Sequence, residues 1–349
     1  MRPEQWQQFK AAAKRQPAAC APLALIVDSP WIPGFLGVNH LDYYLDAETW
    51  FQANLRLAQE FPEVILFPSW WVEYGMAIEP SAMGTRLHFF EDRTPSQTPV
   101  LFRASDIDRF TPVNPLADGW MPLALHRYRT GKQHIFDEGF TLPVAAARGP
   151  LCTAAFVRGV NELMVDLAEE PEAAHRLIGY CTDAVIRWLA AQAEAIGPSV
   201  EGILILDDIA GFLSRRMFRE FALPSFQRIC AAFPSDWVKV YHNDANIRPF
   251  VADLPDTGFD VINFTHNLEI TAVRDATGGK LCLMGNVNPL EIGVRGTPLQ
   301  VKEAALSVLR KMGGSGMILS LGGGISPGMP AENVRALIDA LTEFHASTH

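Results

Sequence analysis

The chain of 349 residues lacks the long apolar run and the basic surface that mark membrane and nucleic-acid-binding proteins. No apolar stretch approaches the roughly 18–20 residues that span a bilayer, and the segment after Met1-Arg2-Pro3 is polar, so neither a membrane span nor a signal peptide is expected. The 29 Lys and Arg are outnumbered by 39 Asp and Glu, and the net charge of −10 argues against nucleic-acid partners and anionic membranes.

Cysteine is scarce, and the five cysteines are scattered without a C-x-x-C pair. A disulfide framework is therefore not expected. We expect reduced thiols in a cytoplasmic protein instead. Low-complexity linkers and short repeats are also missing, which favours a single domain over residues 1–349. Apolar residues are plentiful by contrast: 48% of the chain is hydrophobic, ample material for a large core.

Eight short apolar runs, each ending in a polar or glycine cluster, carry most of the fold information. They are dense in Val, Ile, Leu and Phe without strict alternation, as parallel strands buried on both faces require. Eight strands separated by helical patterns predict an α/β fold, a (β/α)8 barrel with its chemistry at the C-terminal strand ends. The runs are Leu23–Asp28, Val64–Ser69, Leu142–Arg148, Gly202–Asp207, Trp237–His242, Asp260–Phe264, Leu281–Asn286 and Met317–Gly322.

One segment interrupts this rhythm. Residues 70–140 contain turns, a possible hairpin (Arg86–Glu91 with Val100–Phe102) and little helix, so they are predicted to form an insertion that covers the barrel mouth. Helices are expected between the other strands, with a break near Glu170-Pro171 in the longest of them. Their expected ranges are Ala47–Glu60, Asn161–Ile196, Ser214–Phe233, Ile247–Leu254, Leu268–Ala276, Pro298–Met312 and Pro330–His345.

From Gly149 onward the sequence resembles the uroporphyrinogen decarboxylase and corrinoid methyltransferase superfamily. The resemblance covers roughly the last 200 residues in the family's order and implies a (β/α)8 barrel, in agreement with the strand count. It also suggests a homodimer. The matching stretches are Gly149-Pro150-Leu151 with Arg158-Gly159, Glu162 to Pro171, Asp207-Asp208, Met217 to Phe221 with Pro224, Val240 to Asn246, Gly285 to Pro289, and Leu321 to Pro330.

The sequence departs from the decarboxylase branch of that superfamily. Those enzymes hold a substrate with eight carboxylates by arginines after the first strand and an aspartate after the second. Here no Lys or Arg occurs between Arg15 and Arg56, Ser69 stands near the aspartate position, and Gly323 aligns with the family's last-strand histidine. A polyanion without cationic partners would bind poorly, so uroporphyrinogen is not the expected substrate.

The sequence also departs from the coenzyme M methyltransferases, which use a zinc site of His-x-Cys plus a distant Cys. The corresponding positions are His242-Asn243-Asp244 and Gly323, so only the histidine remains. Zinc in that branch activates a thiol. The loss of both sulfur ligands predicts methyl transfer between a corrinoid and a non-thiol partner, such as tetrahydrofolate or a methoxylated small molecule.

His242, Asp244 and His266 lie on adjacent predicted strand ends, and His242, Asp244 and Asp207 are the predicted catalytic residues. Two imidazoles and a carboxylate could bind zinc or a similar ion. The alternative is a metal-free site in which Asp244 orients His242 for acid–base work. Asp207 or Asp208 could supply a general acid or base, or pair with Arg148 instead.

Asn286 and Asn288 stand where the family has Asn-x-Asp, and their amides suit a pterin edge or a substrate carbonyl. They could equally be turn formers before Pro289. Asn263 is a weaker candidate of the same kind. The further binding candidates are Asp208, Arg148, Trp70 and Gly323. The aromatic residues around Trp70 could form a ligand wall, or else lid packing or a dimer contact, and Gly323 would leave room for a bulky ligand.

None of the nine histidines has Asp two residues earlier, so the D-x-H-x-x-G motif of corrinoid proteins is missing. Cobalamin is therefore expected on a separate corrinoid protein or free in solution, beside a small-molecule substrate. Two other functions remain open: a divergent decarboxylase or lyase in which Arg148 holds a small carboxylic acid, and a non-catalytic ligand-binding barrel.

Overall fold

The computed structural model describes residues 1–16 and 20–348, and every predicted run overlaps a strand of one parallel barrel. Six strands pair in the order β10-β9-β8-β7-β6-β5, β1 pairs with β2, and a bridge between Leu23 and Leu319 joins the two groups. The barrel strands are β1 (Ala24–Ile26), β2 (Ile65–Phe67), β5 (Val144–Arg148), β6 (Gly202–Leu206), β7 (Val238–Asn243), β8 (Val261–Phe264), β9 (Cys282–Val287) and β10 (Met317–Leu321).

Side chains close the barrel where hydrogen bonds do not. Within the described residues no ladder joins β2 to β5. One buried cluster, here called the inner core, nevertheless contains side chains from all eight strands, including Phe67 of β2 and Ala146 of β5. Alternate strand residues, such as Ala145 and Ala147, belong instead to the larger core under the helices. This two-sided burial explains why the strands are apolar throughout.

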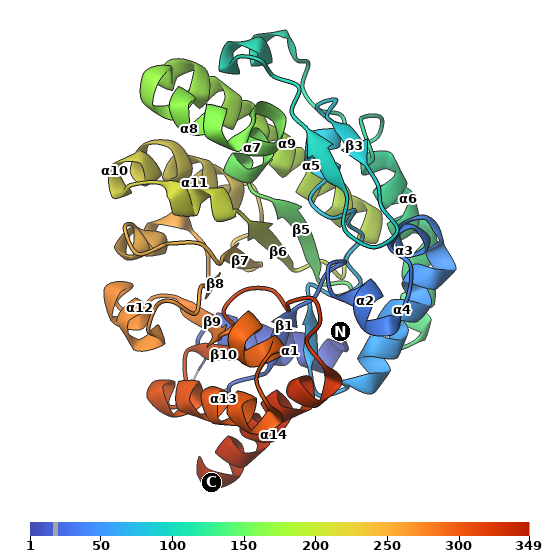
Figure 1. Cartoon of the computed structure of the whole chain (residues 1–349), viewed down its shortest axis with the longest axis vertical. Coiled ribbons are helices and arrows are strands. Elements are labelled where there is room, and N and C mark those ends of the chain that lie inside the picture. The colour runs from blue at the N-terminus through green and yellow to red at the C-terminus, as the bar shows by residue number, and fades with distance from the viewer. Residues whose placement is uncertain (17–19, 349) are drawn as a thin grey trace.

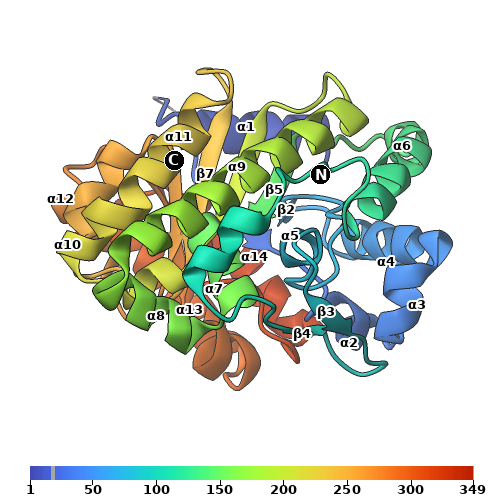
Figure 2. The same ribbon diagram turned by 90° about the horizontal axis from the view of Figure 1, so that it is seen from above.

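Helix α1 (Pro3–Ala13) fills the end of the barrel at which the strands begin. Trp6 and Phe9 of this helix belong to the inner core, and the Phe9 ring stacks on Phe67 with centroids 4.6 Å apart. Lys10 forms an ion pair with Glu201 just before β6. Figures 1 and 2 show α1 on the side of the molecule opposite the β3–β4 hairpin. The C-terminal strand ends are thereby left as the accessible end of the barrel.

Helices surround the strands (Figure 1). They are α2 (Ile32–Leu36), α3 (His40–Leu45), α4 (Ala47–Glu60), α5 (Ile78–Ser81), α6 (Met121–Asp137), α7 (Pro150–Arg158), α8 (Val160–Glu169), α9 (Pro171–Ile196), α10 (Arg215–Met217), α11 (Leu223–Ala231), α12 (Ile270–Ala276), α13 (Pro298–Met312) and α14 (Ala331–Thr348). Shorter 3-10 and π segments are η1 (Ala104–Arg109), η2 (Asp208–Phe212), η3 (Phe218–Ala222), η4 (Val251–Thr257) and η5 (Pro289–Val294). The predicted break at Pro171 is confirmed, and none of the described helices is long and apolar enough to cross a membrane.

Three local predictions were wrong. The hairpin pairs β3 (Arg86–His88) with β4 (Ser96–Thr98), so its second strand comes before the predicted one. The 70–140 segment contains the 17-residue helix α6, whose buried face packs beside α9. The helix expected over Ile247–Leu254 is the later 3-10 segment η4, which has Pro255 inside it. A proline interior to a helix removes a hydrogen bond and disfavours regular α-helix there.

Candidate functional site

Polar residues follow the inner-core positions at the C-terminal end of most strands. Side chains of a strand alternate between its two faces, so the positions two residues after the last apolar inner-core residues also face the barrel axis. Leu204 and Leu206 of β6 lead in this way to Asp208, and Val240 of β7 leads to His242. The set at this rim is Asp28, Arg148, Asp208, His242, Asn263 and Asn286.

Asn263 fixes the tautomer and the orientation of His242. Its amide nitrogen donates to the backbone oxygens of Met284 (2.9 Å) and Leu321 (3.0 Å), which leaves its oxygen as an acceptor. Nδ1 of His242 lies 2.7 Å from that oxygen and therefore carries the proton. The other ring nitrogen, Nε2, faces Asp208 at 3.5 Å. In neutral His242 this nitrogen offers a lone pair to a cation or a proton donor.

Asp208, His242 and Asp244 form the one group in the described chain whose donor atoms suit a metal ion, with all three atoms within 4.8 Å of one another. Asp208 also accepts a hydrogen bond from the backbone N–H of Asp244 (3.1 Å), which holds the two aspartates together. One imidazole and two carboxylates suit a divalent cation that prefers nitrogen and oxygen. The Asn263 contact is the outer hydrogen bond that metal-binding histidines commonly have.

His266, which the sequence placed in this group, lies outside it. Its backbone packs against Gly322, where an added Cβ would lie 2.5 Å from the His266 nitrogen. Its Nδ1 is buried without a hydrogen-bond partner. Asp208, predicted as a binding residue, takes the third position. Gly323 adjoins the same group, since a Cβ there would lie 3.0 Å from Oδ2 of Asp244; glycine leaves this space to the aspartate.

Asp207, predicted to be catalytic, faces the helices instead of the rim. Its carboxylate accepts the backbone N–H groups of Leu151 and Cys152, each at 2.9 Å, in the first turn of α7. Burial raises the pKa of Asp207 to about 7, although these hydrogen bonds oppose the rise. No ion pair with Arg148 forms within the described residues. The alternation of side chains along β6 explains why Asp208 lies at the rim and Asp207 does not: Asp207 shares the outward face of Ile203 and Ile205.

We expect Asp207→Ala to lower the free energy of unfolding by about 2–4 kcal/mol, because two buried helix N–H groups lose their acceptor. Asp207→Asn, which keeps one acceptor oxygen, should cost less. Urea denaturation measures both. A variant with unchanged stability but lost activity would instead restore the catalytic role that the sequence suggested.

The asparagines of the seventh strand end have separable roles. Asn288 caps η5, since its side-chain oxygen accepts from the N–H groups of Leu290 (3.0 Å) and Glu291 (2.9 Å). It is thus the turn former of the two alternatives. Asn286 lies at the rim, where its Nδ2 donates to the backbone oxygens of Thr265 (3.3 Å) and Leu268 (2.7 Å). Its side-chain oxygen accepts no hydrogen bond from the described part of the chain, so it is available to a ligand.

A second acidic group, which sequence reasoning missed, lies at the β1 and β2 side of the rim. Glu73 is buried, and its Oε1 accepts from the N–H of Ser29 (2.9 Å) while Oε2 has no partner. Burial, and next the charge of Asp28, raise the pKa of Glu73 to about 8. Burial also raises the pKa of Asp28 to about 6, and the charges of Arg148 and His242 oppose that rise. Asp28 is therefore close to both of these side chains.

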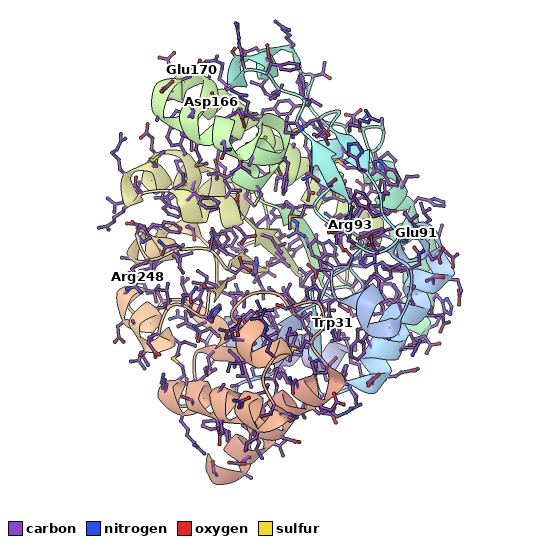
Figure 3. All side chains as sticks on the ribbon, in the orientation of Figure 1. Trp31, Glu91, Arg93, Asp166, Glu170 and Arg248 are labelled. Carbon is purple, nitrogen blue, oxygen red and sulfur yellow. The ribbon has the colours of Figure 1, made fainter. Side chains whose placement is uncertain are left out.

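The two tryptophans after β2, Trp70 and Trp71, have different surroundings. Trp70 packs in an aromatic cluster with Trp50, Phe51 and Phe140, at centroid distances of 5.0–5.8 Å, and lies near Met1 and Gln5 at the α1 end of the barrel, away from the rim. Its neighbour Trp71 belongs to the inner core and lies under the Arg148 guanidinium, 5.3 Å from the ring centroid. Trp31, labelled in Figure 3, is buried beside α2 and donates to the backbone of Met329.

The raised pKa of Glu73 predicts a pH dependence of stability. The folded state holds this proton more tightly than the unfolded chain, so the free energy of unfolding falls as the pH rises from about 4.5 to about 8. Glu73→Gln keeps the acceptor for Ser29 but does not ionise. We expect the variant to be more stable than the parent at pH 8 and to show a flatter profile. Thermal unfolding between pH 5 and 8.5 measures this; parallel profiles would contradict it.

Comparison with known proteins places these observations in a family. The family model described as uroporphyrinogen decarboxylase (URO-D) matches residues 7–344. Uroporphyrinogen decarboxylases of Chlorobaculum parvum and Chloroherpeton thalassium are 28% and 30% identical over 280 and 285 residues, with 77% of this chain and 77% of each relative covered.

Two solved structures share the fold. The first is a methyltransferase from Methanosarcina mazei, with a TM-score of 0.84 and 22% identity over 98% of this chain and 99% of that one. The second is a B12-independent methionine synthase from Shewanella sp. W3-18-1, with a TM-score of 0.60 and 11% identity over 95% and 98% of the two chains. The predicted fold class and the predicted superfamily are confirmed.

Proposed function

Because the chain belongs to the uroporphyrinogen decarboxylase family, we propose that it is a member that transfers a methyl group, between a corrinoid and a non-thiol partner such as tetrahydrofolate or a methoxylated small molecule. The observation that carries this proposal is the group of Asp208, His242 and Asp244 at the barrel mouth, which has no sulfur. The methyltransferase from Methanosarcina mazei, whose fold this chain shares almost end to end, supports the reaction class.

The charge of the rim argues against a substrate with many carboxylates. Asp28, Glu73, Asp208 and Asp244 place four carboxyl groups there, and among the rim residues named above Arg148 is the one guanidinium. A polyanion would lose its hydration and meet carboxyl groups where it needs cations. The curated relatives are named for uroporphyrinogen decarboxylation, and this rim is unsuited to that substrate.

The cysteines argue against a thiol-activating metal site. Cys152, Cys181, Cys230 and Cys282 are buried, and burial raises the pKa of each thiol, that of Cys230 to about 12. Cys20 is exposed but precedes β1, at the opposite end of the barrel. Thiolate ligands are therefore not offered at the rim, and the donor set there favours a partner that reacts through oxygen or nitrogen.

The chain's contribution to methyl transfer would be to position the donor and stabilise the atom that loses the methyl group. Asp208, His242 and Asp244 would hold a divalent cation such as zinc, which when bound supplies Lewis acidity at that oxygen or nitrogen. Asn263 keeps Nε2 of His242 directed at the same place. In a metal-free site, protonated Nε2 would donate to the leaving atom directly. A reduced corrinoid, brought by a separate protein or free, is the nucleophilic co-substrate.

The test follows the corrinoid spectrum. Untagged protein is mixed with cob(I)alamin and, in turn, methyltetrahydrofolate or methoxybenzene derivatives, with and without added zinc. We expect formation of methylcob(III)alamin with one donor class, and no effect of His126→Ala, a change at an exposed position of α6. Carbon dioxide release from a small acid without corrinoid would replace this proposal by the decarboxylase. Ligand binding without turnover would replace it by a non-catalytic barrel.

A further inference from the structure

A cavity of about 380 Å³ lies beside the rim, between the turn after β1, the segment around β4 and the helices α7 and α8. Its walls are mainly apolar, with Pro30, Met76, Pro95, Phe156 and Val160 among them. This volume is near the lower end of the roughly 300–1,000 Å³ range of small-ligand sites. It suits a ligand with a single ring and is small for a tetrapyrrole.

Among the described residues, Arg148 is the only charged side chain that lines this cavity. It is 5% exposed, yet within the described chain its guanidinium forms no ion pair, and its Nε is buried without a hydrogen-bond partner. Its backbone N–H donates to Glu79 (2.8 Å), and its guanidinium lies over Trp71. These contacts hold the side chain in place and leave its N–H groups unsatisfied. Buried guanidinium groups rarely lack partners, so the arrangement indicates a missing acceptor.

The donors available here match a carboxylate better than a phosphate. A single guanidinium can bind both oxygens of a carboxylate in parallel. The nearby helix N-terminus adds little, because Asp207 already accepts the N–H groups of Leu151 and Cys152 in α7. The carboxyl groups near Arg148, Asp28 and Glu73 among them, supply no second cation. A dianionic group would therefore be disfavoured relative to a monoanion.

We propose that this cavity binds the methyl-bearing substrate through its carboxylate, which pairs with Arg148, while its apolar body lies against Phe156 and Val160. The substrate class is then a small, largely apolar carboxylic acid with a methoxy group or a comparable methyl donor. This inference rests on the proposed function for the fate of the methyl group, but its binding step does not.

The register of the barrel strands connects this cavity to the Asp208, His242 and Asp244 group. Arg148 of β5 pairs in register with Leu206 of β6, which in turn pairs with His242 of β7, so Arg148 and His242 lie two strands apart at the same level of the rim. A ligand paired with Arg148 would therefore lie beside that group, and the two sites together would orient a small substrate.

Calorimetric titration without any corrinoid tests this inference, with 4-methoxybenzoate and its neutral amide, 4-methoxybenzamide, as probes. We expect the parent protein to bind the carboxylate about tenfold or more tightly than the amide. Arg148→Gln should remove this preference, Arg148→Lys should retain part of it, and Val160→Trp should weaken both ligands by filling the cavity. Arg93→Gln, at a 62% exposed arginine between β3 and β4 (Figure 3), should leave the binding of both ligands unchanged.

Equal binding of acid and amide, no binding of either, or a carboxylate preference that survives Arg148→Gln would overturn the inference, as would tighter binding of phenyl phosphate. If Arg148→Gln does not fold, Arg148→Lys and Val160→Trp decide the result, because the first keeps the charge and the second changes a partly exposed position at the start of α8. Since no corrinoid is present in the titration, its result does not depend on methyl transfer. The carboxylate preference can be found when transfer fails, and transfer can be found when the preference is missing.

Discussion

Replacing His242 by alanine is expected to abolish methyl transfer and to reduce zinc affinity by more than a hundredfold. The imidazole supplies one of three donor atoms that lie within 4.8 Å of one another, and it is the only nitrogen among them. Its loss should exceed the roughly 10–100-fold reduction that follows removal of an outer hydrogen-bond partner. Zinc titration and the d–d absorption of Co²⁺-loaded protein measure affinity and geometry independently of turnover.

Two further substitutions locate the cause of that loss. Asn263→Leu keeps the ligand but removes the acceptor that orients it, and should cost about 10–100-fold in metal affinity. Asp208→Asn keeps the shape but removes a charged donor, and should behave like His242→Ala. If all three variants bind zinc as the parent does while His242→Ala alone loses activity, the site is metal-free and His242 acts as the proton donor.

Phe67→Ala is expected to lower the free energy of unfolding by about 3–5 kcal/mol. Phe67 is fully buried, stacks on Phe9 of α1, and contributes to the inner core on the side of the barrel where β2 and β5 share no hydrogen bonds. The cavity left by its ring would weaken both the contact with α1 and the barrel closure. Urea denaturation monitored by circular dichroism measures the change.

The matched control is Phe102→Ala, at a phenylalanine that is 90% exposed. It should change stability by less than about 0.5 kcal/mol. A small effect at Phe67 would mean that closure of the barrel does not depend on the inner core. The remaining explanation would then be the helices packed outside the strands.

The strand pattern predicted the barrel and the location of the site at its C-terminal end, because both depend on local apolar runs. The same pattern also contained the information that Asp208, and not Asp207, lies at the rim. On β6, Leu204 and Leu206 face the inner core, so Asp208 and not Asp207 continues that face. Counting alternate residues outward from the core would have separated the rim aspartate from the one that caps α7.

The acidic residues of the insertion could not be predicted in this way. Ser69 and Trp70 have positive φ angles of 82° and 50°, so the alternation of β2 ends before the insertion begins. Period two therefore cannot tell which of Trp70 and Trp71 faces Arg148. Glu73, in the loop after β2, and Glu79, in the short helix α5, reach the rim through long-range packing and not through a local pattern.

The floor formed by α1 has a kinetic consequence. Trp6 and Phe9 are seated among the strands and fill that end of the barrel. A small acid and a corrinoid-bearing protein would then compete for one entrance, and the larger of them would block it on docking. If methyl transfer proceeds as proposed, the small reactant would enter before that complex forms, and its demethylated product would leave only after the complex separates. We therefore expect a compulsory order of addition and release, imposed by a helix on the far side of the reacting atoms.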